Sequence, residues 1–581
     1  MQVKHVTIKR FRGIKSLDWH IGGRIICLVG PGDSTKTTIL DAIDYALGAR
    51  WHIPFTDADF YKGDVSKDII IDVTVGDLPD ELITEDKFGT YLRGYSNKAS
   101  IKDDPDDDCE PVLTIRLQVG NDLEPQWNVI KESNPEPRRI SWRDRERLGL
   151  ARLGNDPDRH FTWSRGSALA KITNQEASTG QTLANANRAA CNAIAKASLS
   201  ELIASARTAQ RVLTEFGVKI ASLRPALDTK SLAFGIGTIS LHDDRVPLRA
   251  FGLGTTRLAA LAVQQIGLGR DAILLIDEIE HGLEPHRIRQ LLKKLCNDKI
   301  IAQQEASGRT IQPHGQVIMT THSPTPIIAL PVTSLRFVFS KNGQTTVKKV
   351  DPAQIDSVQG VVRSRSHALL ARKIIVCEGK TEEALCRVLS EVWANEYEGE
   401  SLSYYGVVPI DGQGRNKGPS SAIEFRRLGY QVLFWGDTDE PIEPNKDELK
   451  AEGVEVVLWP GNMSTEERIT ADLPFSGLQD LVNAAIDEKG EERVLSAIST
   501  LLDHNVVVHG SQLTTWVGNG VDEKSIRSAI GKAAKKTLKG WFKDINCGER
   551  LGRIVAQHLP AMQDTELVRT LNKIKTWVYD E

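Results

Sequence analysis

A glycine-rich loop between a strand pattern and a helix pattern constrains the first half of the chain most strongly. Residues 25–29 form an unbroken apolar run, GPGDST follows, and an amphipathic helix pattern begins at Lys36. Backbone N–H groups at such a helix start bind phosphate, Lys36 would reach the β and γ phosphates, and Thr37 would bind magnesium. The predicted nucleotide site is completed by Gly30, Gly32 and Thr38.

The loop departs from the G-x-x-x-x-G-K-[ST] pattern at one position. Thr35 stands where the last glycine is expected. A β-branched side chain there would crowd the phosphates or cost about 1 to 3 kcal/mol of strain, which predicts weak nucleotide binding or slow turnover. A glycine-rich loop that binds nothing is the alternative for this segment taken alone.

Three later segments add to the nucleotide site. In DAILLIDEIEHGLEP, an apolar strand ends at Asp277 and Glu278, which would hold the magnesium shell and polarise the attacking water. QVIMTTHSP ends a further strand at His322, a candidate γ-phosphate sensor, and FGLGTTRLAAL places glycines, including Gly254, before a helix. Two simpler interpretations stay open: an ordinary loop histidine, and an acidic pair at a helix N-terminus.

The order of these four segments resembles that of ABC-type ATPase heads, in which ATP lies between two heads. The N-terminal strand pair with FRG, and more than two hundred residues between phosphate loop and Asp-Glu strand, resemble the RecF and SMC branch. The resemblance implies a head over residues 1–350. An alanine-rich helical pattern at 174–216 predicts a helical insert over about 166–224, either a dimerisation arm or a packing hairpin.

Two stretches in the last third of the chain place carboxylates after apolar strands. In KIIVCEGKTEEAL, Glu378 follows a strand and Glu382 lies one helical turn later. In VLFWGDTDE, the period of two directs Asp437 and Asp439 to the same side. Such residues could hold one or two magnesium ions, or they could be solvated loop residues.

The two acidic stretches together resemble the TOPRIM domain of topoisomerases, primases and certain nucleases. An interrupted ABC-type head followed by TOPRIM resembles the overcoming-lysogenisation-defect (OLD) family of dimeric DNA nucleases. The resemblance implies two metals in the TOPRIM site, with Glu466 (or the adjacent Glu467) as a further acidic ligand. It also implies a late lysine that stabilises transition-state charge: Lys543, with Lys536 and Lys539 as alternatives.

The predicted fold class is therefore α/β. An ABC/SMC-like head with its helical insert (1–350) precedes a linker (351–367), a TOPRIM nuclease domain (368–500) and a mainly helical C-terminal region (501–581). The basic run at 531–543 is either a DNA-facing helix or a solvated helix face. DGQGRNKG at 411–418 offers Arg415 and Lys417 to a nucleic-acid backbone, or forms a surface turn.

Composition sets outer limits on this interpretation. The 581 residues carry a net charge of −4, which excludes a uniformly basic nucleic-acid coat but not local basic patches. The seven cysteines show no metal-ligand spacing and are predicted to be buried thiols in a reducing compartment. No apolar stretch is long enough to span a bilayer, and the N-terminus lacks a signal-peptide pattern, so we expect a cytoplasmic protein.

The expected function is an ATP-regulated, metal-dependent DNA endonuclease or nickase, with Glu378 and Lys543 as catalytic residues of the nuclease and Glu278 of the ATPase. Expected cofactors are Mg²⁺ or Mn²⁺ and ATP. Expected partners are DNA, a second copy of the chain and a further component of an antiphage defence system, but no membrane. The alternative is an ATP-switched DNA clamp or sensor that does not cut. A topoisomerase-like reaction lacks a convincing tyrosine nucleophile.

Overall fold

The computed structural model divides the chain into two compact units, which we describe separately. The first comprises residues 1–11, 20–25 and 40–319, and the second comprises residues 12–19, 26–39 and 320–581. The structure describes residues 1–96, 100–153, 161–163, 167, 169, 179–197, 200–215, 222, 239–267, 272–296, 315–502, 510–535 and 540–580.

The first unit contains an antiparallel set of strands and a parallel set. The antiparallel strands pair in the order β1 (Gln2–Phe11), β4 (Ile69–Gly76), β7 (Cys109–Val119), β8 (Pro125–Lys131) and β9 (Asn134–Arg139). The short strands β5 (Arg93–Ser96) and β6 (Ile101–Lys102) extend from β7. The parallel strands are β10 (Leu150–Leu153), β13 (Ile273–Ile276) and β14 (Gln316–Thr320). β13 is fully buried, as expected for a strand inside a parallel sheet.

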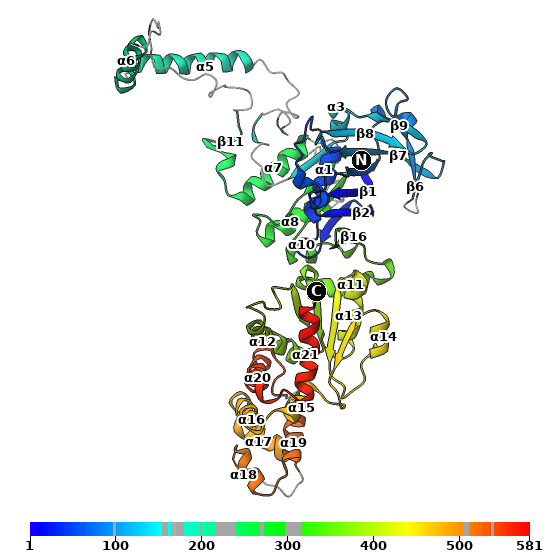
Figure 1. Ribbon diagram of the computed structural model, residues 1–581, viewed down its shortest axis with the longest axis vertical. Coiled ribbons are helices and arrows are strands. Elements are labelled where there is room, and N and C mark those ends of the chain that lie inside the picture. Colours follow the sequence, from blue (N-terminus) through cyan, green and yellow to red (C-terminus); the bar gives the residue numbers. More distant parts are fainter. Residues whose placement is uncertain are drawn as a thin grey trace, which may run out of the picture. The chain divides into compact units, whose positions relative to one another are not determined.

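The described helices of the first unit include the two that were predicted as an insert. Figure 1 shows α5 and α6 as two successive helices in this part of the chain. They cover most of the alanine-rich segment, whereas residues 166, 168, 170–178, 198–199, 216–221 and 223–224 of the predicted insert lie outside the described residues. The helices are α2 (Asp80–Ile83), α3 (Trp142–Glu146), α5 (Thr179–Lys196), α6 (Ser200–Glu215), α7 (Leu253–Gly267) and α8 (Pro285–Cys296).

In the second unit, β3 (Ile25–Val29) leads through the glycine-rich loop into the start of α1 (Lys36–Leu47), whose residues from Leu40 onward are counted in the first unit. β3 pairs in parallel with β15 (Leu335–Lys341), which forms a hairpin with β16 (Gln344–Lys348). β16 in turn meets β2 (Ile14–His20) through the pair Gln344 and Ser16. The limits of β3 and the start of α1 agree with the sequence-based prediction.

A separate parallel sheet of the second unit has the strand order β18, β17, β19, β20. Because all four strands are parallel, their carboxyl ends lie along one edge, where ligands of such sheets commonly bind. The strands are β17 (Lys373–Cys377), β18 (Val407–Asp411), β19 (Gln431–Gly436) and β20 (Glu455–Leu458).

Helices of the C-terminal region share one hydrophobic core with this sheet. Trp435 of β19 and Trp459 after β20 belong to the same buried cluster as Trp516 and Leu551. Figure 1 shows α16, α17, α18 and α19 gathered together, and α21 contacts both α15 and β20. The helices are α10 (Pro324–Ala329), α11 (Ile355–Ser364), α12 (Lys380–Glu396), α13 (Lys417–Leu428), α14 (Lys446–Ala451), α15 (Thr465–Asp472), α16 (Phe475–Lys489), α17 (Glu491–Ser499), α18 (Leu513–Gly518), α19 (Glu523–Lys535), α20 (Ile545–His558) and α21 (Glu566–Tyr579).

Two predictions need correction. Only Cys27, Cys377, Cys386 and Cys547 are buried, whereas Cys109 and Cys191 are half-buried and Cys296 is exposed. The segment predicted as a linker contains α11, and its assignment as a linker stays a prediction. The basic run at 531–543 is not one solvated helix, because the described helix ends at Lys535 and the apolar side chains of Trp541 and Phe542 are buried in the core. None of the described helices is long and apolar enough to cross a membrane.

Candidate functional site

The glycine-rich loop holds Lys36 in place through the loop's own oxygens. Lys36 Nζ donates to the carbonyls of Gly30 (3.0 Å) and Pro31 (2.7 Å) and to Ser34 Oγ (3.1 Å). A Cβ at Gly30 would lie 2.4 Å from the Val338 carbonyl, so glycine permits the close approach of β3 and β15. The ammonium group therefore already points into the loop that was predicted to bind phosphate. Thr37 is exposed, whereas Thr38 is half-buried.

Thr35 adopts a backbone conformation that usually belongs to glycine. Its φ is +67°, in the left-handed region, where a β-branched residue is strained. Thr35 Oγ1 donates to the Ser34 carbonyl (2.6 Å) and lies 3.1 Å from Thr345 Oγ1, and these contacts hold the strained residue. Thr35, the residue that departs from the phosphate-loop pattern, is therefore also a strained residue of the loop.

Replacement of Thr35 by glycine is expected to stabilise the protein. The change relieves about 1 to 3 kcal/mol of strain, offset by about 0.5 to 1 kcal/mol of added freedom in the unfolded chain. Thermal melting should therefore show a higher Tm. The matched control, Thr38→Gly in the first turn of α1, should not raise the Tm, because no strained backbone is relieved there and glycine is about a few tenths of a kcal/mol less favourable than threonine in a helix. A lower Tm for Thr35→Gly would show that the two hydroxyl contacts outweigh the strain.

In the first unit, the Asp-Glu pair after β13 is fixed by two arginines that the sequence did not single out. Arg152 Nη2 lies 3.2 Å from Asp277 Oδ2 and also pairs with Asp41. The buried Arg257 of α7 donates to the backbone carbonyls of Asp277 (2.8 Å) and Glu278 (3.2 Å). Both arginines reach across more than one element, so no local sequence signal marks them.

The glycine-containing segment at the start of α7 packs against the turn after β13. A Cβ at Gly254 would lie 2.2 Å from the Gly282 carbonyl, so no larger residue fits without movement. Glu278 has a φ of +45°, and its carboxylate lies 3.4 Å from the His281 ring. The first unit therefore brings Gly254 and the Asp-Glu turn together. His322, two residues after the end of β14, is counted in the second unit and is exposed.

The acidic residues after β17 and β19 are joined by backbone and side-chain hydrogen bonds. Glu378 Oε2 accepts from the Asp437 backbone N–H (2.9 Å), and a Cβ at Gly436 would lie 2.8 Å from the same oxygen. Glu382 is the third residue of α12, and its Oε2 accepts from the Gly379 N–H (2.8 Å) in a capping arrangement. Strand ends and a helix start thus position three carboxylates.

The third acidic segment reaches the same centre through α15. Thr465 donates its N–H (2.8 Å) and its hydroxyl (3.0 Å) to Asp437 Oδ1. The next residue, Glu466, is 2% exposed, and one of its oxygens lies 2.6 Å from Lys543 Nζ. Glu466 is therefore the acidic residue of this segment that joins Lys543. The alternative, Glu467, instead contacts Lys535 Nζ at 3.4 Å.

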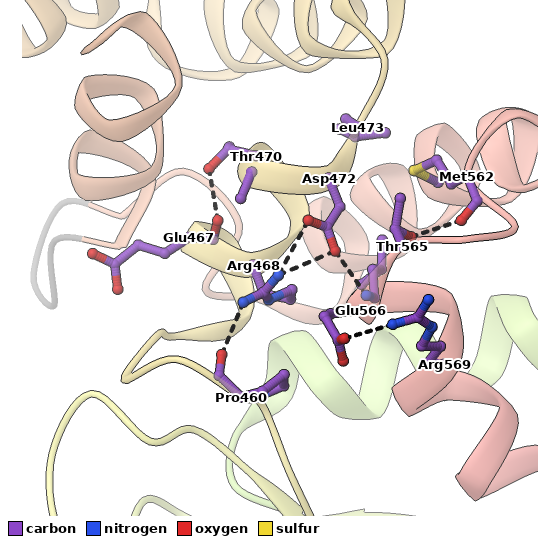
Figure 2. A network of polar contacts seen from close by, with 12 residues as sticks. Pro460, Glu467, Arg468, Thr470, Asp472, Leu473, Met562, Thr565, Glu566 and Arg569 are labelled. Carbon is purple, nitrogen blue, oxygen red and sulfur yellow. Dashed lines mark hydrogen bonds and ion pairs between the residues drawn. The ribbon is translucent and has the colours of Figure 1, made fainter. Parts of the chain in front are cut away.

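A network away from the carboxylates locks α15 in place. Arg468 Nη1 binds Asp472 (3.1 Å), and Arg468 Nη2 donates to the Pro460 carbonyl (2.8 Å). Asp472 Oδ2 also accepts from the Leu567 N–H of α21 (2.7 Å). Figure 2 shows this network and the Glu467 carboxylate pointing away from it. Because both ends of α15 are held, Glu466 has little freedom to leave the centre.

Two lysines contact the carboxylates. Lys543 is held near α12, because Thr381 Oγ1 donates to the Phe542 carbonyl (3.0 Å). Lys535 lies 2.5 Å from Asp439 Oδ2, a contact that sequence reasoning missed although Lys535 belongs to the basic run. Burial alone would lower the pKa of both lysines, but the neighbouring carboxylates raise each pKa above its ordinary value. The alternatives Lys536 and Lys539 lie outside the described residues.

Burial and mutual repulsion perturb the carboxylates. Burial, followed by the charge of Glu466, raises the pKa of Glu382 to about 7. The pKa of Asp437 is also raised, first by burial and then by Glu382 and Glu378. Burial raises the pKa of Glu378, although the Asp437 N–H and Lys543 act in the opposite direction. Clustered carboxylates with raised pKa values are characteristic of functional sites.

These residues fit a divalent cation in one specific respect. Glu466 Oε2 is buried and has no hydrogen-bond partner among the residues that the structure describes. A buried carboxylate oxygen without a partner is costly unless a cation or water satisfies it. No three of the five candidate carboxylates, all of them described, bring one oxygen each within 4.8 Å of one another, so the set does not form a tight cage. Repulsion between carboxylates and the contacts of Lys535 and Lys543 favour this spread arrangement.

The titration of Glu382 gives a testable pH dependence. Between pH 4.5 and 7 the unfolded chain has lost this proton whereas the folded metal-free protein retains it, so stability falls as the pH rises. The loss amounts to no more than about 3 kcal/mol. Thermal melting in EDTA should show a lower Tm at pH 8 than at pH 5.5. Glu382→Gln should reduce this difference while keeping the helix cap, and an unchanged difference would contradict the assignment.

The loop at 411–418 contacts the first acidic turn. The Gly414 N–H donates to the Glu378 carbonyl (2.8 Å), and the Gly412 N–H donates to the Cys377 carbonyl (2.7 Å). Arg415 pairs with Glu440, next to the Asp437 to Asp439 turn, and Lys417 begins α13. The loop therefore lies beside the carboxylates, which the sequence alone did not indicate.

The strand, glycine-rich loop and helix that hold Lys36 define a nucleotide-binding domain of the AAA type. Residues 25–325, more than half of the chain, match the family described as "AAA domain, putative AbiEii toxin, Type IV TA system", and the chain belongs to that family. The first half is therefore an ATPase-type domain, and family membership implies nucleotide binding. No curated protein matches the sequence.

Two solved structures of SMC heads are similar to this chain at low scores. The SmcHead bound to the C-winged helix domain of ScpA is 15% identical, with 61% of this chain and 100% of that chain covered and a TM-score of 0.33. The SMC head domain from Thermotoga maritima is 14% identical, with 60% and 100% covered and a TM-score of 0.27. At TM-scores this low neither structure supports an argument about function.

Proposed function

We propose that the chain is an ATP-regulated, divalent-metal-dependent DNA endonuclease or nickase of the OLD type, with a TOPRIM nuclease domain after the ATPase domain. The observation that carries the proposal is the buried Glu466 carboxylate: one oxygen binds Lys543, and the other has no partner among the described residues. This oxygen belongs to a centre of further carboxylates at the carboxyl ends of parallel strands.

Within this proposal the carboxylates Glu378, Glu382, Asp437, Asp439 and Glu466 would hold Mg²⁺ or Mn²⁺. The bound metal would supply an activated water and stabilisation of the leaving oxygen. Lys543 then places its ammonium group beside the phosphate, where negative charge develops. Arg415 and Lys417, in the loop next to Glu378, offer two cations to the DNA backbone.

Within this proposal, ATP regulation would act through contacts inside the second unit. β15 pairs directly with β3, the strand that leads into the phosphate loop. Phe337 and Phe339 of β15 make edge contacts with Tyr430, at ring-centroid distances of 6.3 and 5.0 Å. Tyr430 immediately precedes β19, which ends at Gly436, the residue before Asp437. A rearrangement at the phosphate loop therefore has a packed route to the carboxylates. In this proposal the active form is a homodimer, and a role in antiphage defence with a further component follows from the OLD resemblance.

A DNA clamp or sensor that does not cut is the second candidate, favoured by the strained Thr35. A loop with a φ of +67° at this position suits a nucleotide switch with slow turnover. In this alternative the C-terminal carboxylates bind DNA through metal without hydrolysing it.

Incubation of the full chain with supercoiled plasmid tests the two candidates. The nuclease proposal predicts nicked or linear DNA with Mg²⁺ or Mn²⁺, intact DNA in EDTA, and a rate that changes when ATP is added. Agarose gel electrophoresis measures the products. DNA binding that depends on ATP, without cleavage in either metal, would contradict the nuclease and support the clamp.

A further inference from the structure

A cavity next to the carboxylate centre has no role in the chemistry described above. Its volume is about 590 Å³, and its walls come from the loop at 461–463, from α15 and from α19. Pockets of about 300 to 1,000 Å³ are the usual size of sites for small organic groups. The cavity residues that matter here are Met463, Glu467, Ala471, Lys524, Arg527 and Lys532.

The walls of this cavity are rigid because α15 and α19 touch at two points. A Cβ at Gly531 would lie 2.6 Å from Thr470 Oγ1, so glycine lets the two helices approach closely. About one turn earlier, Arg527 donates to the carbonyls of Thr470 (2.9 Å) and Leu473 (2.6 Å), at the end of α15. The cavity is therefore formed before any ligand arrives, and binding does not need to order it.

The cavity shares a wall with the carboxylate centre. Glu467 lines the cavity, and its carboxylate lies 3.4 Å from Lys535 Nζ, which in turn lies 2.5 Å from Asp439. The Met463 carbonyl accepts from the Thr438 N–H (3.1 Å), between the two aspartates of the acidic turn. A strand bound at the carboxylates would therefore lie next to the cavity.

The charge of the cavity favours an anionic ligand. Its two carboxylates are already bound, Glu467 by Lys535 and Glu523 by Arg527, at 2.6 Å for the latter pair. Lys524 and Lys532 are exposed, and neither forms an ion pair with a described residue. They lie eight residues apart on α19, which is about 12 Å along the helix. Met463 and Ala471 add apolar surface to the cavity wall.

A nucleotide combines an anionic phosphate and a sugar with a flat base, so its charged and apolar parts suit the two kinds of surface in this cavity. We propose that the cavity holds one nucleotide of a DNA strand, with the base against Met463 and Ala471 and its two flanking phosphates at Lys524 and Lys532, and that the next phosphate along the strand lies at the carboxylates. This inference rests on the proposed nuclease function, because the adjoining acidic turn selects a strand that is being cut. Base stacking and backbone neutralisation together are the usual basis of single-strand binding.

The test compares a labelled strand of twenty thymidines with an abasic strand of twenty phosphodiester units. Binding to the full chain is measured by fluorescence anisotropy, with Ca²⁺ in place of Mg²⁺. Ser528→Trp fills the cavity from α19 and should weaken binding of the thymidine strand about tenfold, because the base loses its place, while binding of the abasic strand stays unchanged. The matched control, Ser525→Trp, lies on the same helix outside the cavity and should leave both affinities unchanged.

The roles of Lys524 and Lys532 are tested separately, through the salt dependence of DNA binding. The double variant Lys524→Glu, Lys532→Glu should weaken binding of both strands and should reduce the slope of log K against log salt by about 1.4, or 0.7 per lost phosphate contact. The double variant Lys446→Glu, Lys450→Glu, at two exposed positions of α14, is the charge-matched control and should change neither quantity. Thermal melting of each variant checks that the fold is retained.

The outcomes separate the cavity from the nuclease proposal. Equal effects of Ser528→Trp on both strands, no effect on either, or a wild-type chain that binds neither strand would overturn the cavity assignment. A selective loss for the thymidine strand would keep the cavity even if Asp437→Asn left cleavage intact, a result that would remove only the role of the carboxylates in cleavage. An unchanged salt slope in the double lysine variant would overturn the phosphate positions.

Discussion

Asp437→Asn is expected to lower metal-dependent cleavage of plasmid DNA by more than about a hundredfold. Loss of a group that merely supports a metal ligand typically costs about 10- to 100-fold, so loss of a charged ligand should cost more. The fold should survive, because an asparagine oxygen can still accept from the N–H (2.8 Å) and hydroxyl (3.0 Å) of Thr465. Removing one negative charge from a repelling cluster should also keep or raise the Tm without metal.

The measurement is the initial rate of plasmid nicking in Mn²⁺ and Mg²⁺, with protein from parallel preparations. Glu455→Gln provides the control. Glu455 is an exposed carboxylate on the neighbouring strand β20, so this substitution removes one negative charge at a position away from the centre. The control should cleave like the wild type. Equal rates for Asp437→Asn and the wild type would show that the carboxylates do not carry the cleavage.

Lys36→Met is expected to weaken ATP binding by about 10- to 100-fold, the usual worth of a hydrogen bond to a charged group. Methionine keeps the apolar stem of the side chain but loses the ammonium group that contacts Gly30, Pro31 and Ser34 in the nucleotide-free loop. Binding is measured by calorimetric titration with ATP. If ATP regulates cleavage through this loop, the variant should cleave plasmid at a rate that ATP no longer changes.

Lys341→Met is the matched control, because Lys341 ends β15 and its side chain is exposed. It should bind ATP with the wild-type affinity. ATP binding that is equal in Lys36→Met and the wild type would exclude this loop as the nucleotide site. If Lys36→Met loses ATP binding as expected but ATP still changes its cleavage rate as in the wild type, ATP regulation acts from another site.

The sequence predicts the buried strands of this protein well. The apolar runs at 25–29, 374–377 and 432–435 correspond to β3, β17 and β19 within one residue at each end. Strands that are buried on both faces of a parallel sheet need continuous apolar residues, which makes them easy to locate. Carboxylates directly after such strands follow from the same pattern, and Glu378 and Asp437 do contact each other.

The parts that could not be predicted depend on contacts between distant segments. Lys535 reaches Asp439 and Glu467 only because Gly531 lets α19 approach α15, and a single sequence does not reveal this approach. Arg152 contacts Asp277 across 125 positions of the chain. The basic run at 531–543 suggested one exposed helix, because its lysines hid the fact that Trp541 and Phe542 belong to the core.

Calorimetric titration of Mn²⁺ into the full chain tests the central claim most directly, because it needs neither a DNA substrate nor an activator. The claim predicts metal binding to the wild type at pH 7.5 or above and its loss in the double variant Asp437→Asn, Glu466→Gln. Thermal melting should confirm that the variant is folded. Equal heats of binding in the wild type and the double variant would contradict a metal site at these carboxylates.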